Sequence, residues 1–373
     1  MKVSALSLRN YRNYAAVDLS TDHRVNVFIG RNAQGKTNLL EAIYMLALTK
    51  SHRASKDKEL IRWGEQHAVL SAMTERKYGD CRLQLDLTTQ GKKARINGLE
   101  QRKLSEYIGT LNVVLFAPED LEIVKGSPGV RRRFLDMEIA QVHPAYLHSL
   151  SQYHKVLVQR NNFLKSGGAA KASGEPMLAV WNEQLAAFGS KIMVRRQGFI
   201  AKLQSWAESI HSGITGGAER LEVGYLPSVE MSPGEDETVL FERFMVKLSQ
   251  MKEQELRRGA TLVGPHRDDL AFRINGKDAY SFGSQGQQRT AALSIKLAEI
   301  ELMKQETGEY PVLLLDDVLS ELDRQRQTQL IETFRSKVQT FITTTGVEGI
   351  RMESLDDVKL FHVSEGAVGD EPG

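Results

Sequence analysis

One stretch near the start of the chain combines glycines, a lysine and a threonine at a spacing that suits phosphate binding. Residues 30–37 read GRNAQGKT and fit the pattern G-x-x-x-x-G-K-[ST]. The apolar run at 25–29 predicts a buried strand before this loop, and the apolar spacing over 38–48 predicts a helix after it. Backbone N–H groups and the positive end of that helix can face a triphosphate, while Lys36 reaches its outer phosphates and the Thr37 hydroxyl holds Mg²⁺. We therefore expect an ATP site with contacts from Gly30, Arg31, Asn32, Ala33, Gln34, Gly35, Lys36, Thr37 and Asn38.

Two aspartates end an apolar run far along the chain. Residues 310–315 predict a second buried strand, and Asp316 and Asp317 follow it. Beside the strand of the phosphate loop in a parallel sheet, Asp316 would reach the Mg²⁺ held by Thr37. Asp317 would stand where a base or a water-orienting group meets the attacking water. Acidic turns after strands are common, so this pattern depends on the phosphate loop for its meaning.

A third polar motif, SQGQQR at 284–289, precedes a helical pattern of apolar residues. A serine hydroxyl and the N–H groups at a helix N-terminus form an anion site suited to a γ-phosphate. We expect Ser284 to act in catalysis and, with Gly286 and Gln287, to contact the nucleotide. Ser-x-Gly before a helix is also ordinary helix capping, and for the motif alone this alternative stays open.

The order of these motifs resembles the ATP-binding-cassette (ABC) class of P-loop ATPases, with SELD at 320–323 as the last motif. The resemblance implies a homodimer in which Ser284 completes the ATP site of the opposite subunit and residues 320–323 line the shared interface. Residues 343–345 occupy the place of the class's switch residue, but the usual histidine is absent, and Asp317 replaces the usual glutamate. Because aspartate is one methylene shorter and reaches less far, we expect a weak ATPase whose slow hydrolysis serves as a switch rather than a pump.

The long interval between Lys36 and Ser284 leaves room for an inserted domain. Apolar residues at helical spacing over 177–210 predict one helix about 50 Å long. Helices over about 143–165 and 237–258 complete a bundle. We therefore expect an α/β fold, an ABC-ATPase P-loop head with a mixed sheet and flanking helices, with an inserted short helical-bundle arm. The head would comprise residues 1–125 and 250–373, and the arm residues 126–249.

Further segments make the chain similar to the RecF family of bacterial recombination mediators, from residue 6 to about 346. They are LRNYRNY at 8–14, SHR at 51–53, PEDL at 118–121, GVRRRFLD at 129–136 and GPHRDDL at 264–270. The resemblance implies ATP-dependent binding of duplex, gapped or junction DNA, cooperation with RecO and RecR, and loading of recombinase onto single-stranded DNA. By resemblance to related heads, Arg12 and Asn13 approach the nucleotide, with an exposed turn as the alternative. His266 and Arg267 either organise the site or form a buried hydrogen-bonded pair.

Basic residues gather in the expected arm. Residues 125–165 contain seven Lys or Arg against two acidic residues, and four more follow at 191–202. Such a stripe can run along the phosphates of DNA, and a solvated helix face is the alternative. The expected DNA contacts are Arg131, Arg132, Arg133, Arg160, Arg195 and Arg196.

Composition narrows the class of protein. In this chain of 373 residues, 26% of the residues are charged, and no apolar run approaches the ~20 residues of a membrane span. The start of the sequence does not read as a secretory signal, so we expect a cytoplasmic protein without membrane contact. The single cysteine, Cys81, cannot form an internal disulfide and is expected on a half-buried strand. Two rival functions remain: a transporter ATPase subunit, which the insert disfavours, and a nucleotide-switched scaffold that recruits repair partners with little DNA contact.

Overall fold

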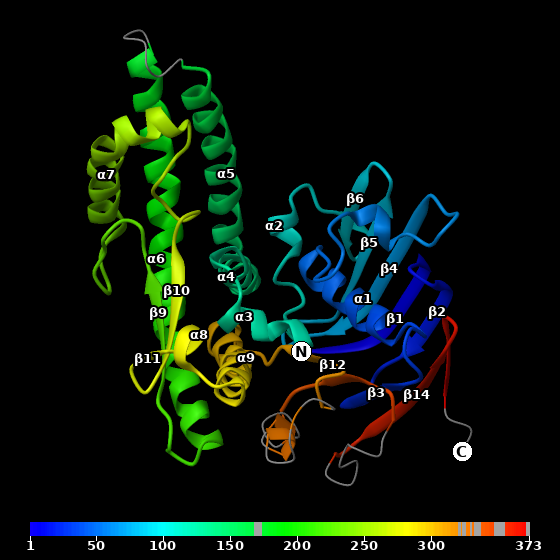
Figure 1. The fold of residues 1–373 in the computed structure, drawn as a ribbon. Coiled ribbons are helices and arrows are strands. Elements are labelled where there is room, and N and C mark those ends of the chain that lie inside the picture. The colour runs from blue at the N-terminus through cyan, green and yellow to red at the C-terminus, as the bar shows by residue number, and fades with distance from the viewer. Residues whose placement is uncertain are drawn as a thin grey trace. The chain divides into compact units, whose positions relative to one another are not determined.

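A computed structural model describes residues 1–167, 174–319, 322, 326–328, 330–331, 337–346 and 355–370. The chain forms two compact units, which we call the head unit (Met1–Leu121 and Ala292–Gly373) and the arm unit (Glu122–Ala291). Residues 250–291, which the sequence places with the head, belong to the arm unit, because strand β10 pairs with β9 and helix α7 packs on α6 there. Figure 1 shows the elements of both units.

The head unit contains a mixed sheet of six strands in the order β15-β14-β3-β13-β12-β8. Neighbouring strands are parallel except β14 and β15, which form an antiparallel hairpin. All five residues of β12 and of β13 are buried, as expected for parallel strands covered on both faces. The strands expected at 25–29 and 310–315 are both present. The strands are β3 Val25–Ile29, β8 Val113–Phe116, β12 Val312–Asp316, β13 Thr340–Thr344, β14 Val358–Ser364 and β15 Ala367–Asp370.

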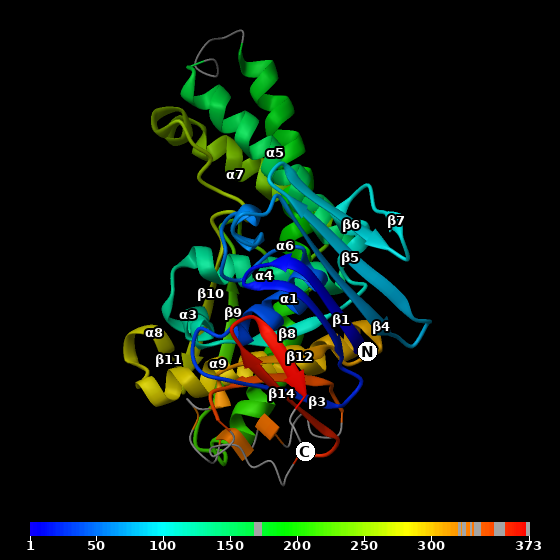
Figure 2. The ribbon, with the colours of Figure 1, turned by 90° about the vertical axis from the view of Figure 1, so that its right-hand side faces the viewer.

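A second sheet of the head unit is antiparallel and was not expected from the sequence. Its six strands follow the order β2-β1-β4-β5-β6-β7, and Figure 2 shows several of them side by side. In β5, buried residues alternate with more exposed ones, so that one face packs inward. Cys81 begins this strand, as expected. The strands are β1 Lys2–Tyr11, β2 Tyr14–Ser20, β4 His67–Glu75, β5 Cys81–Thr88, β6 Gly91–Ile96 and β7 Leu99–Glu100.

Helix α1, Lys36–Leu48, holds the two sheets of the head unit together. It contacts β12 and β13 of the mixed sheet and β4 and β5 of the antiparallel sheet. Most of its residues are buried for this reason, including those on the side opposite the mixed sheet. Further helices of this part include η1 Asp57–Leu60, α2 Leu104–Tyr107 and η2 Pro118–Asp120. Helix α9, Gln285–Thr307, begins in the arm unit and ends in the head unit.

The arm unit is built around helix α6, Glu175–Ile214, which spans 40 residues. Helices α5 and α7 pack on α6 and on each other, which confirms the expected bundle (Figure 1). Gly189 permits close packing here, because a Cβ atom at this position would lie 2.3 Å from the Phe244 ring. The other helices are α3 Leu121–Lys125, α4 Pro128–Val142, α5 Pro144–Lys165, α7 Glu237–Arg258 and α8 Ala279–Phe282.

A small sheet in the order β11-β10-β9 completes the arm unit. Its strands are β9 Leu221–Leu226, β10 Asp269–Ile274 and β11 Lys277–Asp278. Strand β9 packs on α6, so the sheet lies against the bundle. Among the described residues, no helix combines the length and the apolar character needed to cross a membrane.

Candidate nucleotide-binding site

The phosphate loop runs from β3 to α1, and its two glycines are required by close contacts. Gly35 has a φ of 115°, a left-handed conformation that side chains disfavour, and a Cβ atom there would lie 2.5 Å from Nδ2 of Asn13. A Cβ atom at Gly30 would lie 2.2 Å from the carbonyl oxygen of Val363. The loop can therefore keep this path only with glycine at both positions. The intervening Arg31, Asn32 and Ala33 are exposed.

Lys36 is held inside this loop. Its Nζ donates hydrogen bonds to the carbonyl oxygens of Gly30, at 2.6 Å, and Arg31, at 2.9 Å. The lysine is only 7% exposed, and burial lowers its pKa, although the charges of Asp317 and Asp316 oppose this effect. The loop thus fixes a cation beside its own backbone, where an anionic ligand would meet it.

The structure brings Thr37 and Asp316 together, as the sequence predicts for a metal site. Thr37 Oγ1 donates a hydrogen bond to Asp316 Oδ1 at 2.8 Å, although the two residues come from opposite ends of the chain. A hydroxyl and a carboxylate are hard oxygen donors of the kind that Mg²⁺ prefers, so the pair fits this cation. The described residues include no cluster of three or more His, Cys, Asp or Glu placed to hold a metal ion.

Thr343, on the strand β13 beside β12, positions both aspartates. Its Oγ1 donates to Asp316 Oδ1 at 2.8 Å and accepts a hydrogen bond from the backbone N–H of Asp317 at 2.9 Å. Asp317 itself adopts a positive φ of 54°, which turns the chain sharply at the end of β12. Thr343 lies in the segment that resembles the switch region, so this segment contacts the aspartates through a threonine.

Asn13, the residue before β2, contacts the phosphate loop. The turn between β14 and β15 also contacts this loop. Asn13 Nδ2 donates to the Gln34 carbonyl at 2.8 Å, and Asn38 Nδ2 donates to Asn13 Oδ1 at 2.8 Å. Gln34 also accepts a hydrogen bond on Oε1 from the Glu365 backbone N–H at 2.7 Å. Sequence reasoning missed the support from Glu365, and the Glu-Gly pair between the apolar runs of β14 and β15 was its only local signal.

Arg12 is engaged by a buried carboxylate on α1. Its Nε and NH2 donate to the two oxygens of Glu41 at 2.8 and 2.7 Å, and Tyr11 and Ser51 donate to the same carboxylate. Burial raises the pKa of Glu41, but the hydrogen bonds from Arg12 and Ser51 outweigh it and hold the pKa below its usual value. The Arg12 guanidinium therefore links the turn between β1 and β2 to helix α1.

Ser284, Gly286 and Gln287 lie in the arm unit, at the start of α9. Ser284 Oγ accepts from the Gln287 N–H at 3.2 Å, and Gln287 Oε1 accepts from the Ser284 N–H at 2.8 Å, which is a reciprocal cap. The capping alternative is thus realised, and Ser284 nevertheless remains exposed. Of the motif at 320–323, residues 320, 321 and 323 lie outside the described part of the chain.

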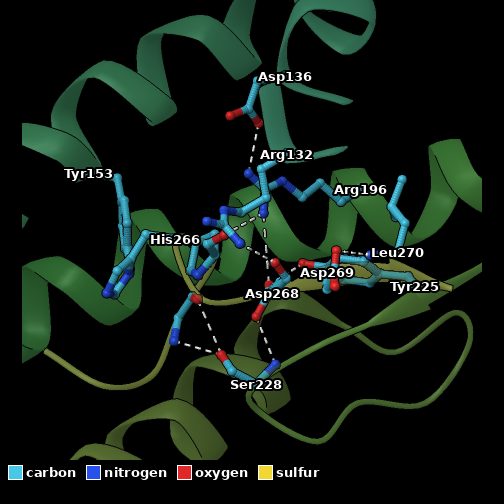
Figure 3. A network of polar contacts seen from close by, with 12 residues as sticks. Arg132, Asp136, Tyr153, Arg196, Tyr225, Ser228, His266, Asp268, Asp269 and Leu270 are labelled. Carbon is cyan, nitrogen blue, oxygen red and sulfur yellow. Dashed lines mark hydrogen bonds and ion pairs between the residues drawn. The ribbon is translucent and has the colours of Figure 1, made fainter. Parts of the chain in front are cut away.

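Several arginines expected at DNA instead pair within the arm unit (Figure 3). Arg196 is 1% exposed and donates to Asp136, the Pro265 carbonyl and the Tyr146 hydroxyl. Arg160, also 1% exposed, donates to Glu255, Thr261 and Asn182. Their burial corrects the prediction for these two residues, because a buried, paired guanidinium presents no surface to a phosphate.

The other four arginines divide into two kinds. Arg131 forms a bidentate ion pair with Asp269, in which Nε and NH2 donate to the two carboxylate oxygens at 2.6 and 2.8 Å. Arg132 donates to the Asp268 carbonyl oxygen at 2.9 Å. Arg133 and Arg195 are exposed. The basic stripe of the sequence is therefore partly an internal network, whereas Arg133 and Arg195 lie on the surface of the arm unit.

His266 belongs to the same network. Its Nε2 lies 3.1 Å from the Thr261 carbonyl oxygen, so this nitrogen carries the proton, and Nδ1 accepts from the Tyr153 hydroxyl at 2.7 Å (Figure 3). Burial lowers the pKa of His266 to about 4, which keeps the ring neutral. Arg267 donates to the same carbonyl through Nε and NH2. The GPHRDDL motif thus supplies hydrogen bonds that hold the arm unit together.

Known proteins share both the sequence and the fold of this chain. Residues 2–367 match the family model of the RecF/RecN/SMC N-terminal domain. The chain is 53% identical over 368 residues to the DNA replication and repair protein RecF of Geobacillus thermodenitrificans, with 99% of each chain covered. It is 54% identical over 368 residues to the RecF of Bacillus cereus strain G9842, covering 99% of this chain and 98% of that one.

Solved structures extend the similarity to three dimensions. The recombination mediator protein RecF of the RecFOR pathway, solved with ATP, has a TM-score of 0.91 at 34% identity, covering 99% of this chain and 97% of the other. The Smc head domain of Pyrococcus furiosus with an extended coiled coil has a TM-score of 0.55 at 14% identity, covering 98% and 94%, and so shows only a shared fold. The fold is therefore an ABC-type P-loop head with an inserted helical arm, as the motif order predicts. With its phosphate loop, paired aspartates and full-length relatives in agreement, the chain belongs to the RecF family.

Proposed function

We propose that this chain is an ATP-dependent DNA-binding protein of DNA replication and recombinational repair. The Thr37 to Asp316 hydrogen bond of 2.8 Å carries the proposal, because it joins the phosphate loop to the aspartate pair in the arrangement that ATP and Mg²⁺ need. The relatives named above are replication and repair proteins, and one of them was solved with ATP. These likenesses support the same ligand and a role in DNA replication and repair here.

In this proposal, the residues of the head unit bind the nucleotide and set the rate of its hydrolysis. Lys36 holds the outer phosphates, Thr37 and Asp316 hold Mg²⁺, and Asp317 orients the attacking water. Thr343 fixes the carboxylate of Asp316 and the backbone of Asp317, so the aspartate pair is held in place before ligand arrives. Because the short Asp317 reaches less far than a glutamate, hydrolysis is slow and resets the protein rather than driving continuous work.

ATP also joins two copies of the chain. Ser284 lies exposed on the arm unit, at a capped helix N-terminus that can face the γ-phosphate bound by a second copy. ATP favours the dimer to the extent that it binds the closed state more tightly than the open one. The closed dimer binds gapped or duplex DNA, works with RecO and RecR, and helps to load recombinase onto single-stranded DNA. Hydrolysis removes the γ-phosphate and so weakens the closed dimer.

Sedimentation of the Ser284→Ala variant tests the shared site. We expect the wild type to dimerise with ATP and Mg²⁺, and Ser284→Ala to bind ATP with similar affinity but stay monomeric. Ser281→Ala is the matched control, because Ser281 is an exposed serine only three positions away. If Ser284→Ala dimerises like the wild type, the shared-site proposal is wrong.

A nucleotide-switched scaffold with little DNA contact is the second candidate, and one observation favours it. Two of the expected DNA-binding arginines, Arg160 and Arg196, are buried in the arm unit. Binding to gapped duplex DNA at several salt concentrations separates the candidates. DNA contact predicts an affinity that falls steeply as salt rises, with a slope of roughly one per phosphate neutralised, whereas a scaffold predicts weak binding throughout.

A further inference from the structure

His52 lies in the segment after α1, and both of its ring nitrogens are buried without a hydrogen-bond partner among the described residues. Its ring packs edge-on against Tyr44, with the ring centroids 5.2 Å apart. Burial lowers the pKa of His52 to about 4, so near pH 7 the ring is neutral, with one donor and one acceptor nitrogen. A buried polar group left without a partner costs on the order of 1–3 kcal/mol, so a binding partner for this ring is expected.

The residues on either side of His52 form hydrogen bonds to the first turns of α1. Ser51 Oγ donates to Glu41, and Arg53 NH1 lies 3.4 Å from Asn38 Oδ1. Glu41 and Asn38 occupy the first two turns of the helix that also carries Thr37. The charges of Glu41 and Asp316 both act on the His52 ring. Asp316 in turn accepts the Thr37 hydrogen bond, so the ring lies within electrostatic reach of the proposed metal site.

The two carboxylates whose charges act on the ring already accept hydrogen bonds from other residues. The Glu41 carboxylate accepts hydrogen bonds from Arg12, Tyr11 and Ser51. Asp316 accepts from Thr37 and Thr343. A ring with one free donor and one free acceptor at this place is suited to an oxygen that arrives with a ligand.

We propose that His52 is a positioning residue of the nucleotide site, in which a ring nitrogen hydrogen-bonds to an oxygen of the bound triphosphate–Mg²⁺ complex. This inference rests on the proposed ATP binding. The oxygen belongs either to a phosphate, which accepts a hydrogen bond from the ring N–H, or to a cation-bound water, which donates one to the bare nitrogen. Either bond ties the phosphate site to the SHR segment at 51–53.

Nitrogen NMR of ¹⁵N-histidine-labelled protein tests the contact directly. The His52→Phe variant identifies the His52 signals by their loss among the nine histidines of the chain. We expect a non-hydrolysable ATP analogue with Mg²⁺ to shift the His52 ring signals. A shift also with the analogue in EDTA assigns a phosphate oxygen, and a shift only with Mg²⁺ present assigns a cation-bound water. Unchanged His52 signals in a protein that binds the analogue would overturn this inference and leave the proposed function standing.

Affinity and thermal stability of the same variant give a second readout. His52→Phe keeps a ring against Tyr44 but removes both nitrogens. We expect the Kd of the analogue with Mg²⁺ to rise roughly three- to tenfold. We expect the melting temperature without nucleotide to stay the same or rise, because two unpartnered buried atoms are gone. The control His67→Phe changes an exposed histidine of β4 in the same unit and should alter neither quantity.

The outcomes separate a ligand contact from a structural role. A variant that melts lower without nucleotide but binds the analogue with unchanged Kd would show that His52 only packs the segment, and the inference would be wrong. A wild type that does not bind the analogue at all would overturn both this inference and the proposed function.

Discussion

Lys36 is the side chain on which nucleotide affinity should depend most. The loop holds its Nζ against the carbonyls of Gly30 and Arg31 and lowers its exposure to 7%. We predict that Lys36→Ala weakens ATP binding on the order of 100-fold, because it removes charge-assisted hydrogen bonds to phosphate, and that ATP-dependent DNA retention is lost with it. Titration with a fluorescent ATP analogue measures the affinity. The control Lys50→Ala alters an exposed lysine just after α1, and an equal loss there would contradict the prediction.

Asp317 should control hydrolysis rather than binding. Thr343 accepts a hydrogen bond from its backbone N–H, and Asp317 directly follows Asp316, the residue proposed to hold Mg²⁺. We predict that Asp317→Asn binds ATP within a few-fold of the wild type but hydrolyses it at least about tenfold more slowly, because an amide cannot take a proton from water. Single-turnover phosphate release measures the rate. Unchanged release would assign the role to another residue.

Single residues of the site differ in how far the sequence reveals them. The phosphate loop and Asp316 could be predicted because their chemistry needs fixed residue types at fixed spacing. The partners of Arg12 and Arg196 could not be predicted, because Glu41 and Asp136 belong to no recognisable motif. They contact these arginines only because the chain folds and packs. His52 is a similar case, because its missing partners become visible only in the folded chain.

At the scale of elements, helix α6 carries two neighbouring arginines with opposite environments. Arg196 is buried in ion pairs and hydrogen bonds, whereas Arg195 is exposed. We predict that Arg196→Ala lowers the free energy of unfolding by about 3–5 kcal/mol, because it leaves buried acceptors without their charged partner. Urea denaturation measures this loss.

The matched variant Arg195→Ala should behave in the opposite way. We predict stability within about 0.5 kcal/mol of the wild type and a slope of DNA affinity against salt that is smaller by about one. Arg195→Ala with full salt dependence would remove Arg195 from the proposed DNA surface. A stable Arg196→Ala protein would show that the buried network contributes little.

Among the elements, long amphipathic helices could be predicted and paired short strands could not. Helices α5, α6 and α7 have many turns over which apolar spacing can repeat. Strands β9 and β10 are each only six residues long, and the whole of α7 lies between them in the sequence. Pairing of this kind depends on contacts between distant segments, which no local pattern contains.

At the scale of the whole molecule, buried neutral histidines make stability depend on pH. Burial lowers the pKa of both His52 and His266 to about 4, below the ordinary value of 6.5. Between these values, the unfolded chain binds more protons than the folded one, so stability is fully present above about pH 6.5 and falls as the pH drops toward 4.

The expected loss is roughly 2–3 kcal/mol for each histidine across that window. Urea midpoints measured from pH 7.5 to pH 4.5 test this expectation for the wild type and for His266→Gln. We predict a shallower pH dependence in the variant, because Gln does not titrate. Parallel curves for the two proteins would show that His266 does not contribute.

The division of the chain into units was only partly visible in the sequence. The long interval between Lys36 and Ser284 pointed to an insert, and the arm unit does occupy it. Its far boundary falls between Ala291 and Ala292, inside helix α9, where neither composition nor a loop signals a change. A helix that continues across a boundary hides that boundary from any reading of the sequence.

The mixed sheet of the head unit has a consequence for synthesis on the ribosome. Strand β3, made early, pairs on one side with β13 and on the other with β14, and both of these partners are translated near the end of the chain. The arm unit, in contrast, is one uninterrupted stretch that can fold as it emerges. The nascent chain therefore carries a folded arm beside an unfinished sheet, and the turn that holds Gln34 forms only when Glu365 has left the ribosome. A message cut short before that codon would yield an arm attached to a phosphate loop without its support.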